Sequence, residues 1–319
     1  MGNAAYEGIH PDDRGNLYLA EDASGAAVHV IPSDPHSPST AHQPNSFVYK
    51  FVPFNTADLS EGGQLYALQV SISGTPLTFH AADPVGDTFS EGQLLLHTPG
   101  TSWPSQWVLV HDTVTQGFAA FNANAAAKAA GATPFKRPEN LQFLPGSGFN
   151  VFYFCPTGDT DALAGQQDAL AMRGAWGSIF RVEFSGDNPY GETSIFFRGD
   201  ADHASFDNLA FADTQTLLAT EDRGDGLHTQ LNRLDSVWAF DVRGDVNPRR
   251  LLALGRDAVA TQDVAQNGEG DNEPTGLLVS DGDPSPHQLL GKPGSPNAAR
   301  WFFTQQHGMN QTFEILATR

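Results

Sequence analysis

The chain has 319 residues, a formal net charge of -20 at pH 7 and 39% hydrophobic residues. This hydrophobic content is sufficient for a sizeable core, so the composition excludes an intrinsically disordered chain. The acidic balance argues against nucleic acids and anionic membranes as partners, because their phosphates are repelled at long range. The single cysteine, Cys155, excludes a disulfide or a thiolate zinc cluster built within one chain.

The N-terminal stretch MGNAAYEGIH has neither the basic region nor the apolar stretch of a signal peptide, so none is expected in this chain. No run of about 18 apolar residues occurs, and we therefore expect no membrane-spanning helix. The 32 glycine and 21 proline residues favour many short strands joined by turns over a helical fold.

A repeat organises the chain. An acidic residue, a short apolar run, a turn and a second apolar run follow one another four times, and the acidic starts are Glu7, Glu139, Asp207 and Glu273. Glu139 and Asp207 are 68 residues apart, and Asp207 and Glu273 are 66 apart. Glu7 precedes Glu139 by 132 residues, twice 66, so we expect one further unit between them that has lost or displaced its acidic marker.

Each repeat unit has the length of a four-stranded propeller blade with generous loops. Alternating apolar and polar residues predict outer strands in SFVYKFV and QLYALQV, in SIFRVEF and TSIFFRG, and in SVWAFDV and RRLLALG. The segment from about 72 to 134 is irregular: WVLVHD predicts a strand, and NANAAAKAAGA a short helix or inserted loop. We predict an all-β fold, a β-propeller of five or six four-stranded blades with residues 1–319 as one domain. A β-sandwich or two small β-domains is the alternative.

The repeat also predicts a metal site. The start of one strand of a hairpin and the end of the next lie side by side, so inner hairpins of successive blades would bring their ends together around a central channel. Carboxylates gathered there repel one another unless a cation is present, and a site of oxygens alone suits a hard cation, calcium first. The expected ligands are Glu7, Glu139, Asp207 and Glu273.

Five further acids end the second strands or follow them, and they are candidates for additional or outer metal ligands: Glu21, Asp22, Asp159, Glu221 and Asp222. An acid at a strand end can equally be a turn residue that caps loop amides. Recurrence of the four markers at one blade position favours the metal. The run NGEGDNEPTG alternates oxygen donors with glycines but lacks the spacing of an EF-hand.

Two residues are candidates for catalytic roles. Arg137 lies two residues before Glu139, and strand alternation would put both side chains on one face. Beside a metal its planar fork could clamp an anionic substrate, and the alternative role is a salt bridge to Glu139. His307, near the end of the fourth hairpin, is a candidate proton donor or outer ligand. No Gly-x-Ser-x-Gly motif occurs, which argues against a serine hydrolase.

The phrases YEGIHPDDRGNLYLAED, RPENLQFLPGSGFNVFYFCPTGD, SFDNLAFADTQTLLATED and NEPTGLLVS resemble the PhoX-type alkaline phosphatases. The resemblance covers most of the chain and weakens between about 72 and 134. It implies a periplasmic or secreted propeller that hydrolyses phosphate esters with calcium ions and, in the best-known members, an oxo-bridged iron pair. It further implies that Glu7, Glu139, Asp207 and Glu273 bind metal and that Arg137 contacts the phosphate.

The chain departs from the iron-bearing members at two places. The cysteine that ligates iron upstream of the Glu7-type motif has no counterpart, and Gly8 stands where an acid often follows that glutamate. We therefore expect a site dominated by Ca²⁺, with more than one ion, and Fe³⁺ only as the alternative.

Three functions remain open from the sequence. The first is a metal-dependent hydrolase, expected to be a monomer, that acts on small-molecule phosphate esters. The second is a gluconolactonase-like calcium propeller that cleaves lactones or phosphotriesters, whose neutral substrates would make Arg137 dispensable. The third is a non-catalytic propeller in which calcium is structural.

Overall fold

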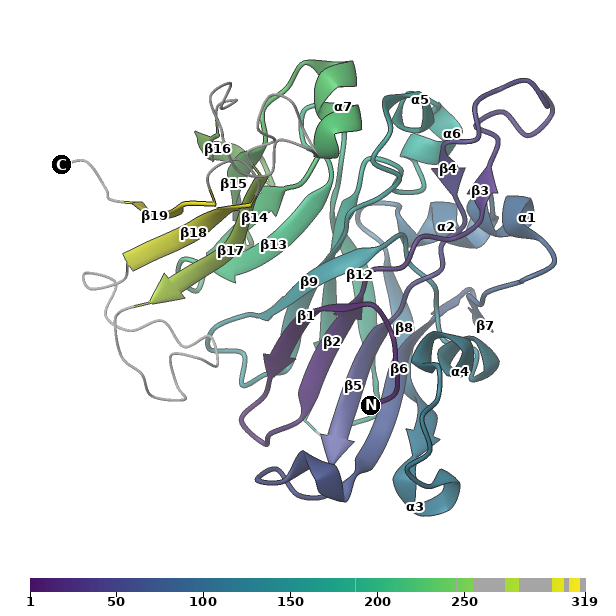
Figure 1. The fold of residues 1–319 in the computed structure, drawn as a ribbon, viewed down its shortest axis with the longest axis vertical. Coiled ribbons are helices and arrows are strands. Elements are labelled where there is room, and N and C mark those ends of the chain that lie inside the picture. Colours follow the sequence, from purple (N-terminus) through teal and green to yellow (C-terminus); the bar gives the residue numbers. More distant parts are fainter. Residues whose placement is uncertain (187, 245, 255–272, 281–299, 307–309, 316–319) are drawn as a thin grey trace.

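The computed structural model describes residues 1–186, 188–244, 246–254, 273–280, 300–306 and 310–315 (Figure 1). The strands are β1 (Tyr6–Pro11), β2 (Leu17–Glu21), β3 (Ala27–Val28), β4 (Ala41–His42), β5 (Val48–Pro53), β6 (Gly63–Ile72), β7 (Thr75–Pro76), β8 (Ser102–Asp112), β9 (Pro138–Phe143), β10 (Val151–Pro156), β11 (Ser178–Phe184), β12 (Tyr190–Arg198), β13 (Phe206–Phe211), β14 (Thr216–Glu221), β15 (Ser236–Asp241), β16 (Arg249–Ala253), β17 (Glu273–Ser280), β18 (Arg300–Gln306) and β19 (Thr312–Ile315). The helices are η1 (Leu59–Glu61), α1 (Pro84–Thr88), α2 (Glu91–Leu96), α3 (Thr113–Gln116), α4 (Ala123–Ala129), α5 (Ala162–Gly165), α6 (Asp168–Ala171) and α7 (Gly224–Leu231). None of these helices is long and apolar enough to cross a membrane.

Antiparallel units of consecutive strands make up the fold. The strand order β1-β2-β5-β6 forms one four-stranded unit, β9-β10-β11-β12 a second, β13-β14-β15-β16 a third, and β17-β18-β19 a three-stranded sheet. Strand β1 contacts β9, β9 contacts β13, and β13 contacts β17. Figure 1 shows these four strands one after another across the centre of the molecule. The predicted mostly-β fold is confirmed, and each acidic marker lies on the first strand of its unit.

The segment between the first two units differs from the prediction. We expected one more repeat unit there, but the segment contributes short helices and the long strand β8 instead. Strand β8 pairs with β6 on one side and β12 on the other, which joins the first two units into one ten-stranded sheet. The expected helix in NANAAAKAAGA is α4, and Asn122 caps it by accepting a hydrogen bond from the Ala125 amide.

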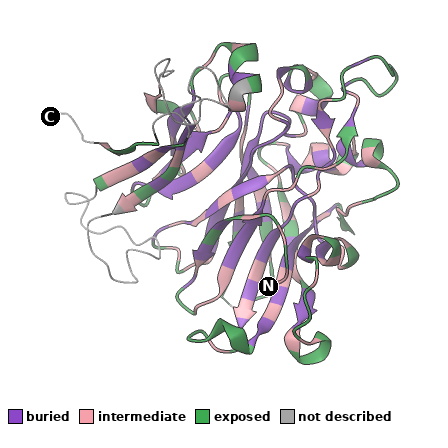
Figure 2. Ribbon diagram, viewed as in Figure 1, coloured by how far each residue is buried: buried purple, intermediate pink, exposed green. Residues whose placement is uncertain are grey.

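Two apolar clusters hold the units together. Strand β10 is buried along its whole length, because its side chains alternate between the two clusters. Phe152 and Phe154 face the cluster inside the ten-stranded sheet, whereas Tyr153 and Cys155 face the cluster shared with the third unit. In Figure 2 the buried colour runs along these central strands. Complete burial of each phenylalanine stabilises this arrangement by about 1.5–3 kcal/mol.

Irregular strand pairing marks the start of the inner strands. The register shifts between Tyr6 and Ile9 in β1, and between Phe206 and Leu209 in β13. Such β-bulges turn a side chain away from the regular alternation. Gly8 lies in the first bulge, where an added Cβ would come within 2.7 Å of the Asn140 Cα atom. Glycine at this position therefore allows β1 to approach the backbone of β9.

Candidate metal centre

Six carboxyl groups near the starts of the inner strands and the ends of their hairpin partners interact through their charges, and we call them the carboxylate cluster: Glu7, Asp22, Glu139, Asp207, Asp222 and Glu273. Glu7, Asp22 and Glu139 each offer one oxygen, and these oxygens lie within 4.8 Å of one another. Besides burial, the charge of Asp222 raises the pKa values of both Asp207 and Glu273, and the charge of Asp207 also raises that of Glu273. The structure therefore brings two of the four predicted ligands, Glu7 and Glu139, within reach of one ion together with the outer acid Asp22. Asp207, Asp222 and Glu273 are close enough for their charges to interact.

A repeated backbone contact places the two aspartates. The amide of Asp22 donates to the Ala5 carbonyl at 2.8 Å, and the amide of Asp222 donates to the Ser205 carbonyl at 2.8 Å. In each hairpin this contact ties the residue after the second strand to the residue two before the acidic marker. In the second unit Thr157 takes the same place and donates to the Arg137 carbonyl at 2.9 Å. That unit therefore adds no second carboxylate.

Glu21 and Glu221 lie outside the carboxylate cluster, contrary to our expectation. Each precedes a cluster aspartate, and successive strand residues point to opposite faces. Glu21 accepts hydrogen bonds from the Phe47 amide at 3.1 Å and the Tyr49 hydroxyl at 2.9 Å. Glu221 accepts from the Ala204 amide at 2.9 Å. Both carboxylates thus brace neighbouring backbone.

Asp159 also lies outside the carboxylate cluster. Both of its oxygens accept from Lys136 Nζ, at 2.6 and 2.5 Å, and one accepts from the His42 amide at 3.0 Å. These buried donors occupy the carboxylate, so the predicted outer metal role is not what the structure shows. The other predicted residue, His307, lies outside the described part of the chain.

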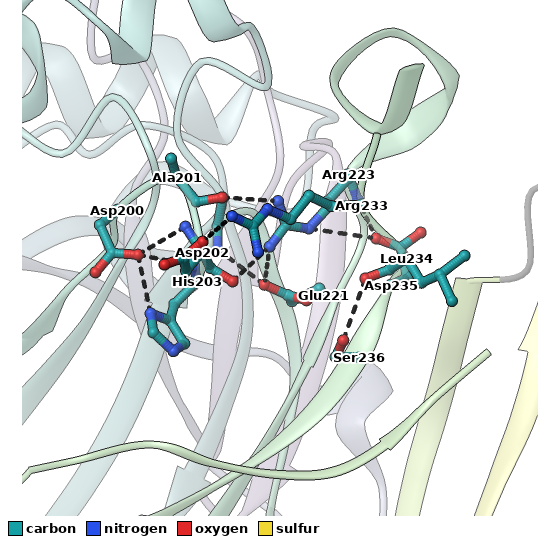
Figure 3. A network of polar contacts seen from close by, with 11 residues as sticks. Asp200, Ala201, Asp202, His203, Glu221, Arg223, Arg233, Leu234, Asp235 and Ser236 are labelled. Atoms are coloured by element: carbon teal, nitrogen blue, oxygen red, sulfur yellow. Dashed lines mark hydrogen bonds and ion pairs between the residues drawn. The ribbon is translucent and has the colours of Figure 1, made fainter. Parts of the chain in front are cut away.

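Sequence reasoning missed Arg223, which follows Asp222 and is 1% exposed. Figure 3 shows its guanidinium against Glu221, which accepts from it at 2.6 Å, and against the carbonyls of Ala201 and Asp202. A buried glutamate one residue before a cluster aspartate needs such a partner. The sequence could have indicated this role, because Arg223 directly follows the adjacent acids Glu221 and Asp222.

Arg223→Met should lower the free energy of unfolding by about 3–5 kcal/mol, because the Glu221 carboxylate loses its buried partner. Urea unfolding measures the loss. Arg243→Met is the matched control, since Arg243 is exposed and contacts the Thr214 hydroxyl. We expect this control to stay within about 0.5 kcal/mol of the parent. Equal stability of the two variants would contradict the structural role of Arg223.

Burial and mutual repulsion raise the pKa values of the cluster carboxyls. Burial, followed by the charges of Asp22 and Asp207, raises the pKa of Glu139 to about 10. Burial, with Asp222 and Asp207, raises the pKa of Glu273 to about 11, and burial raises that of Asp207 to about 7. Without a cation several of these groups hold a proton near neutral pH, and a bound cation would favour their ionised forms.

Arg137 is a guanidinium within the carboxylate cluster. Its Nε donates to Asp22 at 2.7 Å, and its Nη2 donates to Asp22 at 3.1 Å and to Glu139 at 3.3 Å. Burial alone would lower the pKa of Arg137, but hydrogen bonding to Asp22 and the charges of Asp22, Glu139 and Asp222 raise it above its ordinary value. The expected proximity to Glu139 is present, and the backbone φ of +58° at Arg137 departs from a regular strand.

The donor set fits a hard cation such as calcium, because every member of the carboxylate cluster offers oxygen. The thiol of Cys155 donates to the Asp207 carbonyl at 2.8 Å, and burial raises its pKa well above its ordinary value. A protonated thiol bound to backbone does not fit a thiolate ligand of iron. Glu7 is exposed, so the cluster is open to solvent on that side.

Comparisons with known proteins bear on the fold and the family of the chain. A solved structure of Pseudomonas fluorescens PhoX in complex with vanadate, a transition state analogue, superposes with a TM-score of 0.53 at 16% identity, which shows a shared fold. The alignment covers 96% of this chain and 49% of that one, so the chain spans about half the length of this solved relative. No curated protein sequence matches the chain. The family model described as Alkaline phosphatase PhoX matches residues 9–283, most of the chain, and the protein therefore belongs to the PhoX family.

Proposed function

We propose that the protein hydrolyses small-molecule phosphate esters at the carboxylate cluster, with divalent cations bound there. The observation that carries this proposal is Arg137, a guanidinium held by Asp22 and Glu139 among carboxylates suited to metal. Family membership and the fold shared with a vanadate-binding relative support it. We propose Ca²⁺ as the metal, because the described donors are carboxylate oxygens, and more than one ion, because six carboxylates gather.

In the proposed reaction, the bound cations, Arg137 and the carboxylates around it have different roles. Bound cations would polarise phosphoryl oxygens and lower the pKa of an attacking water. Arg137 would bind the phosphoryl group through its guanidinium and offset charge that shifts during transfer. Its contacts with described residues use Nε and Nη2, so Nη1 can be offered to a phosphoryl oxygen. Asp22 and Glu139 hold the guanidinium in that orientation.

The architecture around this site is part of the proposal. We propose that the units are blades of one propeller domain over residues 1–319, supported by the four inner strands lying side by side. The five or six blades expected from the sequence included a unit between Glu7 and Glu139 that β8 and short helices replace. Family membership supports an exported protein, periplasmic or secreted, and we propose that it acts as a monomer. The lactonase-like and non-catalytic readings remain the competing hypotheses.

A substrate panel tests the proposed function. Phosphate monoesters and diesters, neutral lactones and phosphotriesters are each assayed with the calcium-loaded protein and after chelation. We expect the charged esters to be hydrolysed, the activity to disappear on chelation, and added Ca²⁺ to restore it. Cleavage confined to neutral substrates would establish the lactonase-like reading. A chelation-sensitive melting temperature without any activity would establish structural calcium.

A further inference from the structure

Arg137 holds its guanidinium on a backbone that non-glycine residues rarely adopt. Its φ is +58°, in the left-handed region, and Ser205 two residues before Asp207 has a φ of +55°. Such conformations persist only where the surrounding structure holds them, and they gather at functional sites. The contacts that hold the Arg137 backbone therefore also determine where its guanidinium lies at the proposed phosphate subsite.

The segment that follows β10 holds the backbone at Arg137. The Thr157 amide donates to the Arg137 carbonyl at 2.9 Å, and the Gly158 amide donates to the Lys136 carbonyl at 3.2 Å. An added Cβ at Gly158 would lie 2.5 Å from the Ala175 carbonyl oxygen, so this segment packs closely against the backbone at Ala175. It ends at Asp159, whose amide donates to that same Ala175 carbonyl at 2.8 Å.

A buried ion pair between Lys136 and Asp159 links the segment after β10 to the residue before Arg137. Lys136 is 5% exposed and Asp159 is 3% exposed, and the ammonium contacts both carboxylate oxygens at 2.6 and 2.5 Å. Replacing a buried ion pair with apolar residues of similar size is often neutral or stabilising, so stability alone does not account for the pair. Lys136 directly precedes Arg137, so the ion pair can also fix the position of the Arg137 backbone.

We propose that the Lys136–Asp159 pair is a positioning device that keeps Arg137 in its left-handed conformation, with the guanidinium at the phosphate subsite. This inference rests on the proposed function of Arg137. Lys136 and Asp159 touch no substrate in this scheme and act only through Arg137. Misplacement of a binding group by about 1 Å can cost a hundredfold in rate.

The test removes both charges at once. Single substitutions would leave a buried charge without its partner and could unfold the protein, so the variant is Lys136→Met/Asp159→Leu. We expect it to keep the parent's calcium-dependent melting temperature and to lose about tenfold to a hundredfold in kcat/KM for a phosphate monoester. The control is Arg181→Met/Glu183→Leu, which removes a more exposed ion pair of the same unit, with N and O atoms 2.7 Å apart. This control should leave kcat/KM unchanged.

Combining the paired variant with Arg137→Ala distinguishes a positioning role of the ion pair from a merely structural one. The paired variant combined with Arg137→Ala should be no less active than Arg137→Ala alone, because both changes act through the same guanidinium, whereas independent sites add their effects. Full additivity, or a paired variant as active as the parent, overturns the proposal. Affinity for inorganic phosphate, measured on the calcium-loaded protein, gives a readout apart from turnover. If the parent hydrolyses no ester, the proposed function fails, and an unchanged phosphate affinity of the paired variant then overturns the positioning role as well.

Discussion

Arg137→Ala should lower turnover of phosphate monoesters and diesters by about a hundredfold or more. The guanidinium lies beside Glu139 and Asp22, where its fork can reach a phosphoryl oxygen held on the metal ions. Charge on those oxygens is redistributed during transfer, so a fixed cation stabilises the transition state more than the bound substrate. Steady-state kinetics on the calcium-loaded protein measure the loss, which should fall mainly on kcat.

Two controls locate the origin of this effect. Arg137→Lys should recover only part of the activity, because an ammonium cannot reproduce the bidentate contact with Asp22 that orients the remaining donor, Nη1, toward the phosphoryl oxygen. Calcium content and melting temperature should stay near those of the parent, because the bound cations balance Asp22 and Glu139. A variant that loses metal or unfolds, with normal activity per folded molecule, would show that the arginine is structural. Neutral substrates cleaved equally well by parent and variant would instead favour the lactonase-like reading.

The stability that calcium adds should grow as the pH rises. In the metal-free protein the pKa values of Glu139 and Glu273 are about 10 and about 11, against 4.5 for an ordinary glutamate. The folded state therefore holds more protons than the unfolded state between these values, and the free energy of unfolding falls as pH rises through this range. The slope is up to about 1.4 kcal/mol per pH unit for each carboxyl that stays protonated.

Bound calcium should replace those protons and remove the pH dependence. At a hundredfold excess over its dissociation constant a ligand adds about 2.7 kcal/mol to the free energy of unfolding. Thermal melting at pH 6, 7.5 and 9, about one and a half units apart, compares metal-free and calcium-loaded protein, and we expect the widest gap at the highest pH. Glu139→Gln is the control, because an amide does not titrate and should flatten the metal-free profile. A gap that stays constant with pH would contradict the role of these carboxyls.

Local patterns were sufficient for the first strand of each unit and for the main members of the carboxylate cluster. An acid followed by an apolar run places Glu7, Glu139 and Asp207 at the start of a strand, and hairpin pairing brings the end of the next strand beside it. Because these relations involve residues close in the chain, the repeat in the sequence was enough to predict them. Arg137 lies beside Glu139 as expected, but strand alternation does not place it there, because Arg137 precedes β9 and has a φ of +58°.

Tertiary structure decided which of two neighbouring acids enters the carboxylate cluster. Glu21 and Asp22 are adjacent and chemically alike, and only one can face the cluster while the other faces the opposite side. The Phe47 amide and the Tyr49 hydroxyl come from elsewhere in the chain and take the glutamate, which leaves the aspartate for the cluster. Lys136 takes Asp159 in the same way.

The sequence also could not predict that β8 joins the first two units into one sheet. Residues 102–112 read as one more strand, and nothing in their alternation says which edges they will pair with. In the fold β8 bridges the outer strands β6 and β12, so no additional repeat unit lies between Glu7 and Glu139. Strand alternation is a local property that a sequence carries, whereas the choice of pairing edge and of the partner for a buried charge depends on segments distant in the chain.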